Sequence, residues 1–203
     1  MEDWMNRCTL CPRRCGADRT GSVGRCGVGE QVRLARAALH FWEEPCVSGE
    51  EGSGTVFFSG CSLGCVFCQN YQISAGHFGR DIPVERLAEI FLELQEQKAN
   101  NINLVTGGHY IPQIVRALDL VRGKLHIPVV YNSSGYETVE ALRMLKGYVD
   151  VYLPDLKYRS PERGARYSHA PDYFAVASKA ILEMLDQVGP VRFDGQGMIQ
   201  KGL

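Results

Sequence analysis

Short apolar segments alternate with amphipathic helical segments from residue 55 onward, and this alternation constrains the fold more than any other feature of the sequence. The spacing predicts helices over residues 82–99, 110–124, 136–147 and 170–189. Each helix is preceded by an apolar run typical of a buried strand, namely "TVFFSG", "NINLVTGG", "IPVVYNSSG" and "VDVYLPDLKY". Four consecutive strand–helix units predict an α/β fold with a parallel sheet and right-handed crossovers.

Polar side chains follow these predicted strands. The active sites of βα barrels lie at the carboxyl ends of the strands, so we expect these side chains to converge on one rim. They are Cys61, Thr106, Asn132, Asp155 and Lys157. A fifth strand starts within "GMIQKGL", where the sequence ends, and a closed barrel cannot be completed from these residues. We therefore expect either a partial, open barrel or a fragment of a longer one.

Composition and charge are those of a globular protein. The 203 residues are 45% hydrophobic and 22% charged, with a formal net charge of −1. This balance lacks the basic excess of nucleic-acid-binding chains, and no apolar run is long enough for a membrane span. The first residues carry no apolar signal-peptide core, so we expect a cytoplasmic protein. We divide the chain into a Cys-rich N-terminal extension, residues 1–54, and a core domain, residues 55–203.

Cysteine is concentrated in the first third of the chain. In a reducing compartment such clustered cysteines are more often metal ligands than disulfides. The eight cysteines are Cys8, Cys11, Cys15, Cys26, Cys46, Cys61, Cys65 and Cys68. They fall into two groups and one single residue, and each group predicts a metal site.

The second group forms the pattern C-x3-C-x2-C in "GCSLGCVFCQN", directly after the first predicted strand of the core. Three thiolates suit a [4Fe–4S] cluster, whose fourth iron then has no protein ligand and stays open for chemistry. The alternative is a zinc site that takes its fourth ligand from elsewhere in the chain. The spacing and the strand-to-loop position favour the cluster.

"CSLGCVFC" after the first strand resembles the motif of the radical S-adenosylmethionine (SAM) superfamily. Together with "HFWEEPCVSG", "VVYNSSGYE", "DVYLPDLKY" and "YSHAPDY", it resembles the group related to the pyruvate formate-lyase activating enzyme, over roughly residues 8–199. The resemblance implies a partial (β/α)6 barrel of the TIM-like type, with a [4Fe–4S] cluster on Cys61, Cys65 and Cys68 and SAM bound at the open iron. Reductive cleavage of SAM would yield a 5′-deoxyadenosyl radical that abstracts a hydrogen atom.

The same resemblance implies a set of SAM-binding positions near the strand ends. They are Asn70, Gly107, Gly108, Asn132, Ser133, Ser134, Asp155 and Lys157. His109 stands where many members of the superfamily have Glu, which leaves the side-chain contact to the SAM amino group unassigned. Simple turn chemistry explains the glycine pair and "NSSG" equally, and Asp155 with Lys157 also suits a plain ion pair.

The first cysteine group has the pattern C-x2-C-x3-C-x10-C in "CTLCPRRCGADRTGSVGRC". This segment is too short for a hydrophobic core of its own, so Cys8, Cys11, Cys15 and Cys26 suggest a metal staple. Zinc and a second iron–sulfur cluster both suit four thiolates, and the sequence does not decide between them. Cys46 is left over and is interpreted as a buried small residue.

These observations predict a radical SAM iron–sulfur enzyme similar to the activating proteins of glycyl-radical enzymes. The implied partners are a flavodoxin- or ferredoxin-type electron donor and a glycyl-radical enzyme or another protein substrate, with no nucleic acid and no membrane. A small-molecule substrate stays open. The alternatives are a structural zinc or iron–sulfur binding module without catalysis, and an inactive truncated fragment.

Overall fold

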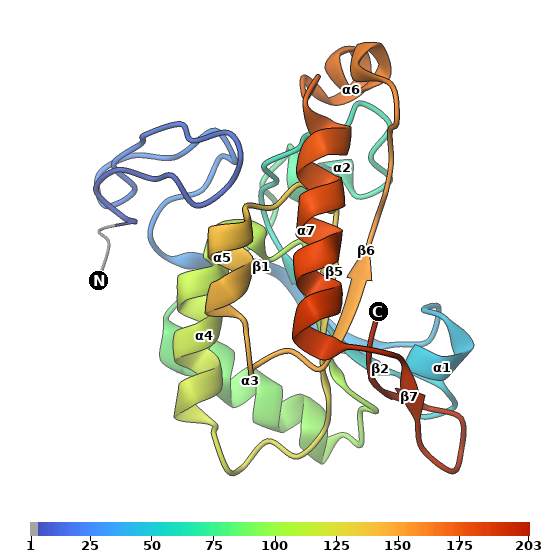
Figure 1. Ribbon diagram of the computed structural model, residues 1–203. Helices are drawn as coiled ribbons and strands as arrows, with labels where there is room; N and C mark the ends of the chain where they lie inside the picture. The colour runs from blue at the N-terminus through green and yellow to red at the C-terminus, as the bar shows by residue number, and fades with distance from the viewer. Residues whose placement is uncertain (1–3) are drawn as a thin grey trace.

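A six-stranded sheet forms the centre of the computed structural model, which describes residues 4–203 (Figure 1). The strands are β1 (Val32–His40), β2 (Ser53–Phe58), β3 (Arg80–Ile82), β4 (Ile102–Val105), β5 (Val129–Ser133) and β6 (Val151–Pro154). Their order across the sheet is β3-β1-β2-β4-β5-β6. The last four strands of this order run parallel, while β1 is antiparallel to both of its neighbours. The predicted α/β fold with a mostly parallel sheet is confirmed.

Helices follow each of the parallel strands. The longer ones are α3 (Val84–Glu96), α4 (Ile111–Leu120), α5 (Val139–Met144), α6 (Pro161–Ser168) and α7 (Tyr173–Val188). Single turns form α1 (Pro45–Ser48), α2 (Tyr71–Ser74) and the 3-10 helix η1 (Gly108–Tyr110). Figure 1 shows α3, α4, α5 and α7 packed together on one side of the sheet. The predicted alternation is present from β2 to α7.

The main core lies between these helices and the outer face of the sheet. Leu87, Phe91 and Leu94 of α3 are buried there, as the helical spacing predicts. Ile111 and Ile114 of α4 are also fully buried in this core. Burial of a large aliphatic or aromatic side chain contributes about 1.5–3 kcal/mol, so these two helices are held mainly by packing on the sheet.

β1 joins residues before 55 to the sheet of the core. The run "QVRLARAALHFW" forms one long strand that lies between two partners. Leu34 faces Phe58 of β2, and Val32 faces Ile82 of β3. The strand therefore lies inside the sheet, paired with β2 from Leu34 to His40 and with β3 over Val32, Arg33 and Leu34.

The inner face of the sheet is covered only in part. Val47 of α1 and Ile199 of β8 (Ile199–Lys201) pack there on Val130 and Val151. β8 pairs with β7 (Arg192–Phe193), and the following Gly202 pairs with Val151, so this segment lies beside β6. These contacts close the inner face near the amino ends of the parallel strands.

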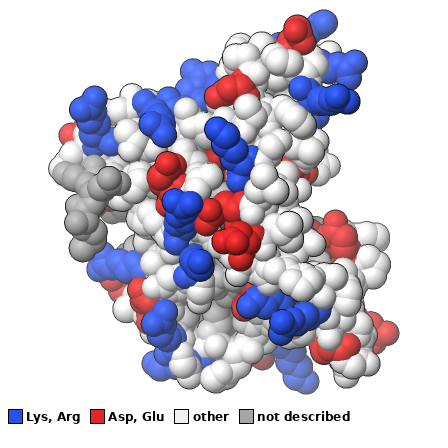
Figure 2. All heavy atoms as spheres, viewed as in Figure 1, with Lys and Arg blue, Asp and Glu red and all other residues white. Residues whose placement is uncertain are grey.

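The surface carries both signs of charge. Figure 2 shows Lys and Arg (blue) interspersed with Asp and Glu (red) over the face that it draws, in keeping with the net charge of −1. Within residues 4–203, none of the helices has the length and apolar character that crossing a membrane requires.

Candidate functional site

A cavity of about 820 Å³ opens at the carboxyl ends of the parallel strands. Its volume lies within the range of about 300–1,000 Å³ typical of sites for cofactors and small molecules. Predicted site residues that line it are Cys61, Cys65, Cys68, Asn70, Asn132, Ser134, Asp155 and Lys157, and Thr106 lies beside them. The strand ends therefore converge on one rim, as the alternation predicts.

The three-cysteine loop leaves β2 through a tight backbone contact. Gly60 has a φ of 85°, and a Cβ at this position would lie 2.5 Å from the Cys26 carbonyl oxygen. Only glycine permits that approach. Further along, Asn70 lines the cavity, and its carbonyl accepts backbone hydrogen bonds from Ile73 and Ser74 at the start of α2.

The thiols of this loop lie close to one another around the cavity. Burial raises the pKa of the Cys61 thiol, and the nearby Cys65 and Cys68 thiols add to this effect. The Leu63 amide donates a hydrogen bond to Cys61 Sγ at 3.4 Å, and the Ser74 hydroxyl donates to Cys68 Sγ at 3.3 Å. Hydrogen bonds of this kind adjust the potential of iron–sulfur clusters.

This donor set fits a [4Fe–4S] cluster. Three thiols come from one loop, two sulfurs accept hydrogen bonds, and an open cavity lies beyond them. Among residues 4–203, no three His, Cys, Asp or Glu side chains are close enough to hold a single metal ion. In a [4Fe–4S] cluster each thiolate binds a different iron atom, so the three sulfurs can lie farther apart than around a single ion. Because thiolate is the binding form, loading the cluster must release the thiol protons.

The turn after β4 faces the helices more than the cavity. Gly107 packs against Ile114 of α4, and a Cβ on Gly108 would lie 2.3 Å from Glu137 Oε2, so neither glycine lines the cavity. The buried His109 has Nε2 at 2.8 Å from the Ser59 carbonyl oxygen, which makes this nitrogen the donor. Burial lowers the His109 pKa to about 4, so the ring is neutral. It ties the β4 turn to the end of β2.

Glu137 is a buried ionisable residue beside the site that sequence reasoning missed. Its carboxyl group is buried beneath Gly108, where Oε1 accepts hydrogen bonds from Ser133 Oγ at 2.8 Å and from the Tyr131 hydroxyl at 3.3 Å. Oε2 has no hydrogen-bond partner. Burial raises the Glu137 pKa to about 7, although the two hydrogen bonds act in the opposite direction. Ser133 thus points to this carboxyl group and does not line the cavity.

The ends of β5 and β6 carry the polar side of the cavity. Lys157 Nζ lies 2.6 Å from Asp155 Oδ2, so the two side chains form the ion pair that the sequence offered as the alternative to SAM contacts. Behind this pair, the buried Tyr173 hydroxyl lies 2.7 Å from the Ser134 carbonyl oxygen and 3.0 Å from that of Asp155. It also accepts a hydrogen bond from the Lys157 amide at 2.9 Å. Tyr173 therefore holds two cavity-lining turns in a fixed relation.

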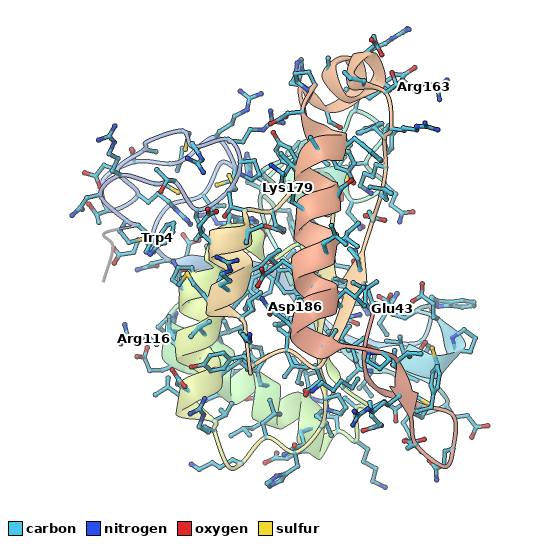
Figure 3. All side chains as sticks on the ribbon, viewed as in Figure 1. Trp4, Glu43, Arg116, Arg163, Lys179 and Asp186 are labelled. Atoms are coloured by element: carbon cyan, nitrogen blue, oxygen red, sulfur yellow. The ribbon has the colours of Figure 1, made fainter. Side chains whose placement is uncertain are left out.

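Aromatic side chains surround the mouth of the cavity. Trp42 is 88% exposed and Phe67 is 57% exposed, and both line the cavity. His40 and Glu43 also line it, and burial raises the Glu43 pKa. Figure 3 labels Glu43 in the loop before α1. Three of these four residues lie before residue 55, outside the alternating strand and helix segments from which the sequence predicts the site.

The N-terminal cysteines lie outside this cavity. Cys8, Cys11 and Cys26 are buried, Cys15 is exposed, and none of them lines the cavity. Cys46 is half-buried and packs beside Val47 on the inner face of the sheet.

Comparison with known proteins adds two findings. The profile of a family described as "Radical SAM superfamily" matches residues 55–191. The chain is also 35% identical over 188 residues to the uncharacterized protein MJ0674 of Methanocaldococcus jannaschii, an alignment that covers 89% of this chain and 54% of that protein. The chain thus spans about half the length of the curated relative that it matches.

Proposed function

Because this chain belongs to the radical SAM superfamily, we propose that it is an enzyme that cleaves SAM reductively at a [4Fe–4S] cluster held by Cys61, Cys65 and Cys68. One observation carries the proposal: a single cavity joins these three thiols to the polar ends of β5 and β6. Bound there, the cluster and SAM would supply one-electron cleavage of a carbon–sulfur bond and a 5′-deoxyadenosyl radical for hydrogen abstraction.

The residues of the chain would bind and orient the cofactors. SAM carries hydroxyl groups and a charged amino acid end, which suit the amide of Asn132 and the opposite charges of Asp155 and Lys157. Tyr173 would keep these groups in register, since it fixes the turns that carry them. Trp42 and Phe67 at the mouth would limit the access of water once a substrate covers them.

We further propose that hydrogen abstraction takes place on a glycine of a partner protein, as in activating enzymes. The exposed side chains of Trp42 and Phe67 support a protein substrate, because large aromatic residues are favoured in protein interfaces. A flavodoxin- or ferredoxin-type protein would supply the electron. On this proposal the parallel strands form part of a (β/α)6 barrel. The protein acts in the cytoplasm, where thiols stay reduced.

The test is anaerobic reconstitution with iron and sulfide, followed by assay of 5′-deoxyadenosine release from SAM under a strong reductant. Changing Cys61, Cys65 or Cys68 to Ala is expected to abolish release, while Cys46→Ala, outside both cysteine groups, leaves it unchanged. Zinc without iron at the three cysteines would contradict the proposal and favour a structural metal-binding module.

A further inference from the structure

The N-terminal segment, residues 4–31, is folded without regular structure. No helix or strand lies within this range, and apart from cysteine its buried hydrophobic side chains are Leu10 and Val28. Leu10 and Val28 pack in the main core together with Cys8 and Cys26. Three thiols of the segment are buried, since Cys8, Cys11 and Cys26 are only 5%, 7% and 7% exposed. Figure 3 shows sulfur atoms (yellow) gathered along this segment, beside α5. A segment with so little apolar burial needs another source of order.

The backbone brings the four cysteines together. The Cys8 amide donates to the Ala17 carbonyl at 2.9 Å, and the Gly16 amide donates to the Cys8 carbonyl at 2.9 Å, so Cys8 lies beside the chain that follows Cys15. A Cβ on Gly24 would lie 3.4 Å from Cys26 Sγ and 3.5 Å from Cys15 Sγ, so these two sulfurs face a common point. Cys11 follows Cys8 by three residues and is likewise buried.

We propose that Cys8, Cys11, Cys15 and Cys26 bind a second metal centre through their thiolates and that this centre braces the three-cysteine loop. The site lies outside residues 55–191, which the superfamily profile matches. Four thiolates suit zinc or an iron–sulfur cluster. Because no three such side chains within residues 4–203 are close enough for one ion, a zinc site requires several of these thiols to shift together, whereas a cluster accepts a wider spacing.

Arg13 connects this centre to the catalytic loop. It lies between Cys11 and Cys15, and its guanidinium donates to the carbonyl oxygens of Ser62 at 2.8 Å and Leu63 at 3.2 Å. Both carbonyls belong to the three-cysteine loop. The same group donates to the carbonyls at the end of α6, those of Ser168 at 2.6 Å and His169. A metal on both flanks of Arg13 would fix its backbone and thereby the loop.

A second connection is direct. The Cys61 amide donates to the Cys26 carbonyl at 3.3 Å, so a ligand of each proposed centre shares one backbone hydrogen bond. On the other side of the segment, the buried Arg19 donates to the His109 carbonyl at 2.6 Å. The N-terminal segment therefore supports the loop after β2 and the turn after β4 together.

The metal site does not depend on the proposed function, and one variant separates them. A chain with Cys61, Cys65 and Cys68 all changed to Ala is expected to keep a metal after anaerobic purification: about four irons with sulfide for a cluster, or about one zinc. Changing Cys11 and Cys15 to Ala in the otherwise natural chain removes that metal, and Cys46→Ala does not. If the triple variant, shown to be folded by circular dichroism, holds less than a tenth of an equivalent of either metal, the site does not exist. Failure of the reconstituted natural chain to cleave SAM, with the N-terminal metal present, would contradict the proposed function alone.

The brace is tested by Arg13→Ala against Arg14→Ala, its exposed neighbour. Arg13→Ala is expected to keep the N-terminal metal and to lower the iron held by the three-cysteine loop at least threefold, with a shift in the midpoint potential of the remaining cluster. Arg13→Lys, which keeps a charged donor, is expected to restore part of the iron content and part of the midpoint potential. Iron content and potential equal to those of Arg14→Ala, which removes the same charge from a neighbouring exposed position, would overturn the brace.

Discussion

The buried carboxyl group of Glu137 is expected to make the stability of the protein depend on pH. In the natural protein His109 offsets most of this dependence. Its pKa is raised from the ordinary value of 4.5 to about 7. Between these values the folded state holds a proton that the unfolded state has lost, so the free energy of unfolding falls as pH rises. Each pKa unit corresponds to about 1.4 kcal/mol, and the full loss above pH 7 is on the order of 3 kcal/mol.

His109 acts in the opposite direction. Its pKa is lowered from 6.5 to about 4, so the unfolded state binds a proton first as pH falls. The free energy of unfolding therefore falls as pH drops from 6.5 toward 4. Between about pH 4.5 and 6.5 the two slopes cancel, and the contribution of this pair is nearly flat.

Glu137→Gln removes the contribution of Glu137 to the pH dependence of the unfolding free energy and leaves that of His109. Gln keeps an oxygen for Ser133 and Tyr131 at nearly the same volume, so the variant is expected to match the natural protein near pH 4.5 and to become more stable than it by about 3 kcal/mol near pH 7.5. Urea unfolding at a series of pH values measures the difference, with the exposed Glu140→Gln as control. A difference that stays constant within about 0.5 kcal/mol across this range would refute the reasoning.

Two further predictions concern the same edge of the sheet. Gly108→Ala places a Cβ 2.3 Å from Glu137 Oε2 and is expected to cost about 1–3 kcal/mol of unfolding free energy. Combining it with Glu137→Ala should recover most of this cost in a double-mutant cycle, and strictly additive costs would argue against the clash. Tyr173→Phe leaves three backbone groups of the cavity turns without their partner and is expected to weaken SAM binding about 5- to 30-fold by calorimetry, at about 1–2 kcal/mol. Tyr167→Phe, which packs against the same hydrophobic cluster as Tyr173, serves as its control; equal affinities for the two variants would contradict the positioning role.

Local patterns predict the scaffold and much of the cavity. The burial of Leu87 and Phe91 follows from helical spacing alone, because neighbours on a helix face are set by chain geometry. The convergence of Cys61, Asn132 and Asp155 follows from the parallel strands, since their carboxyl ends share one edge.

Local sequence patterns do not predict which charged residues the tertiary structure buries or which distant groups they contact. Glu137 stands before a predicted helix, where a carboxylate is ordinarily a solvated residue of the first turn, and only the turn after β4 buries it. Arg13 has four carbonyl partners that are distant in the sequence, so no local signal identifies them. The run "QVRLARAALHFW" likewise does not reveal that a single strand has two partners.

The N-terminal residues and the superfamily core work as one unit at the site. β1 separates β2 from β3 and is hydrogen-bonded to both, so its removal would leave two strand edges and the outer core uncovered. Trp42 reaches the mouth of the cavity from the end of β1, while Arg13 and Arg19 hold the loop and the turn beneath it. The superfamily profile begins at residue 55, so these contacts come from residues that it does not match. Variants that test the cavity and the three-cysteine loop should therefore include residues before 55 as well as those after it.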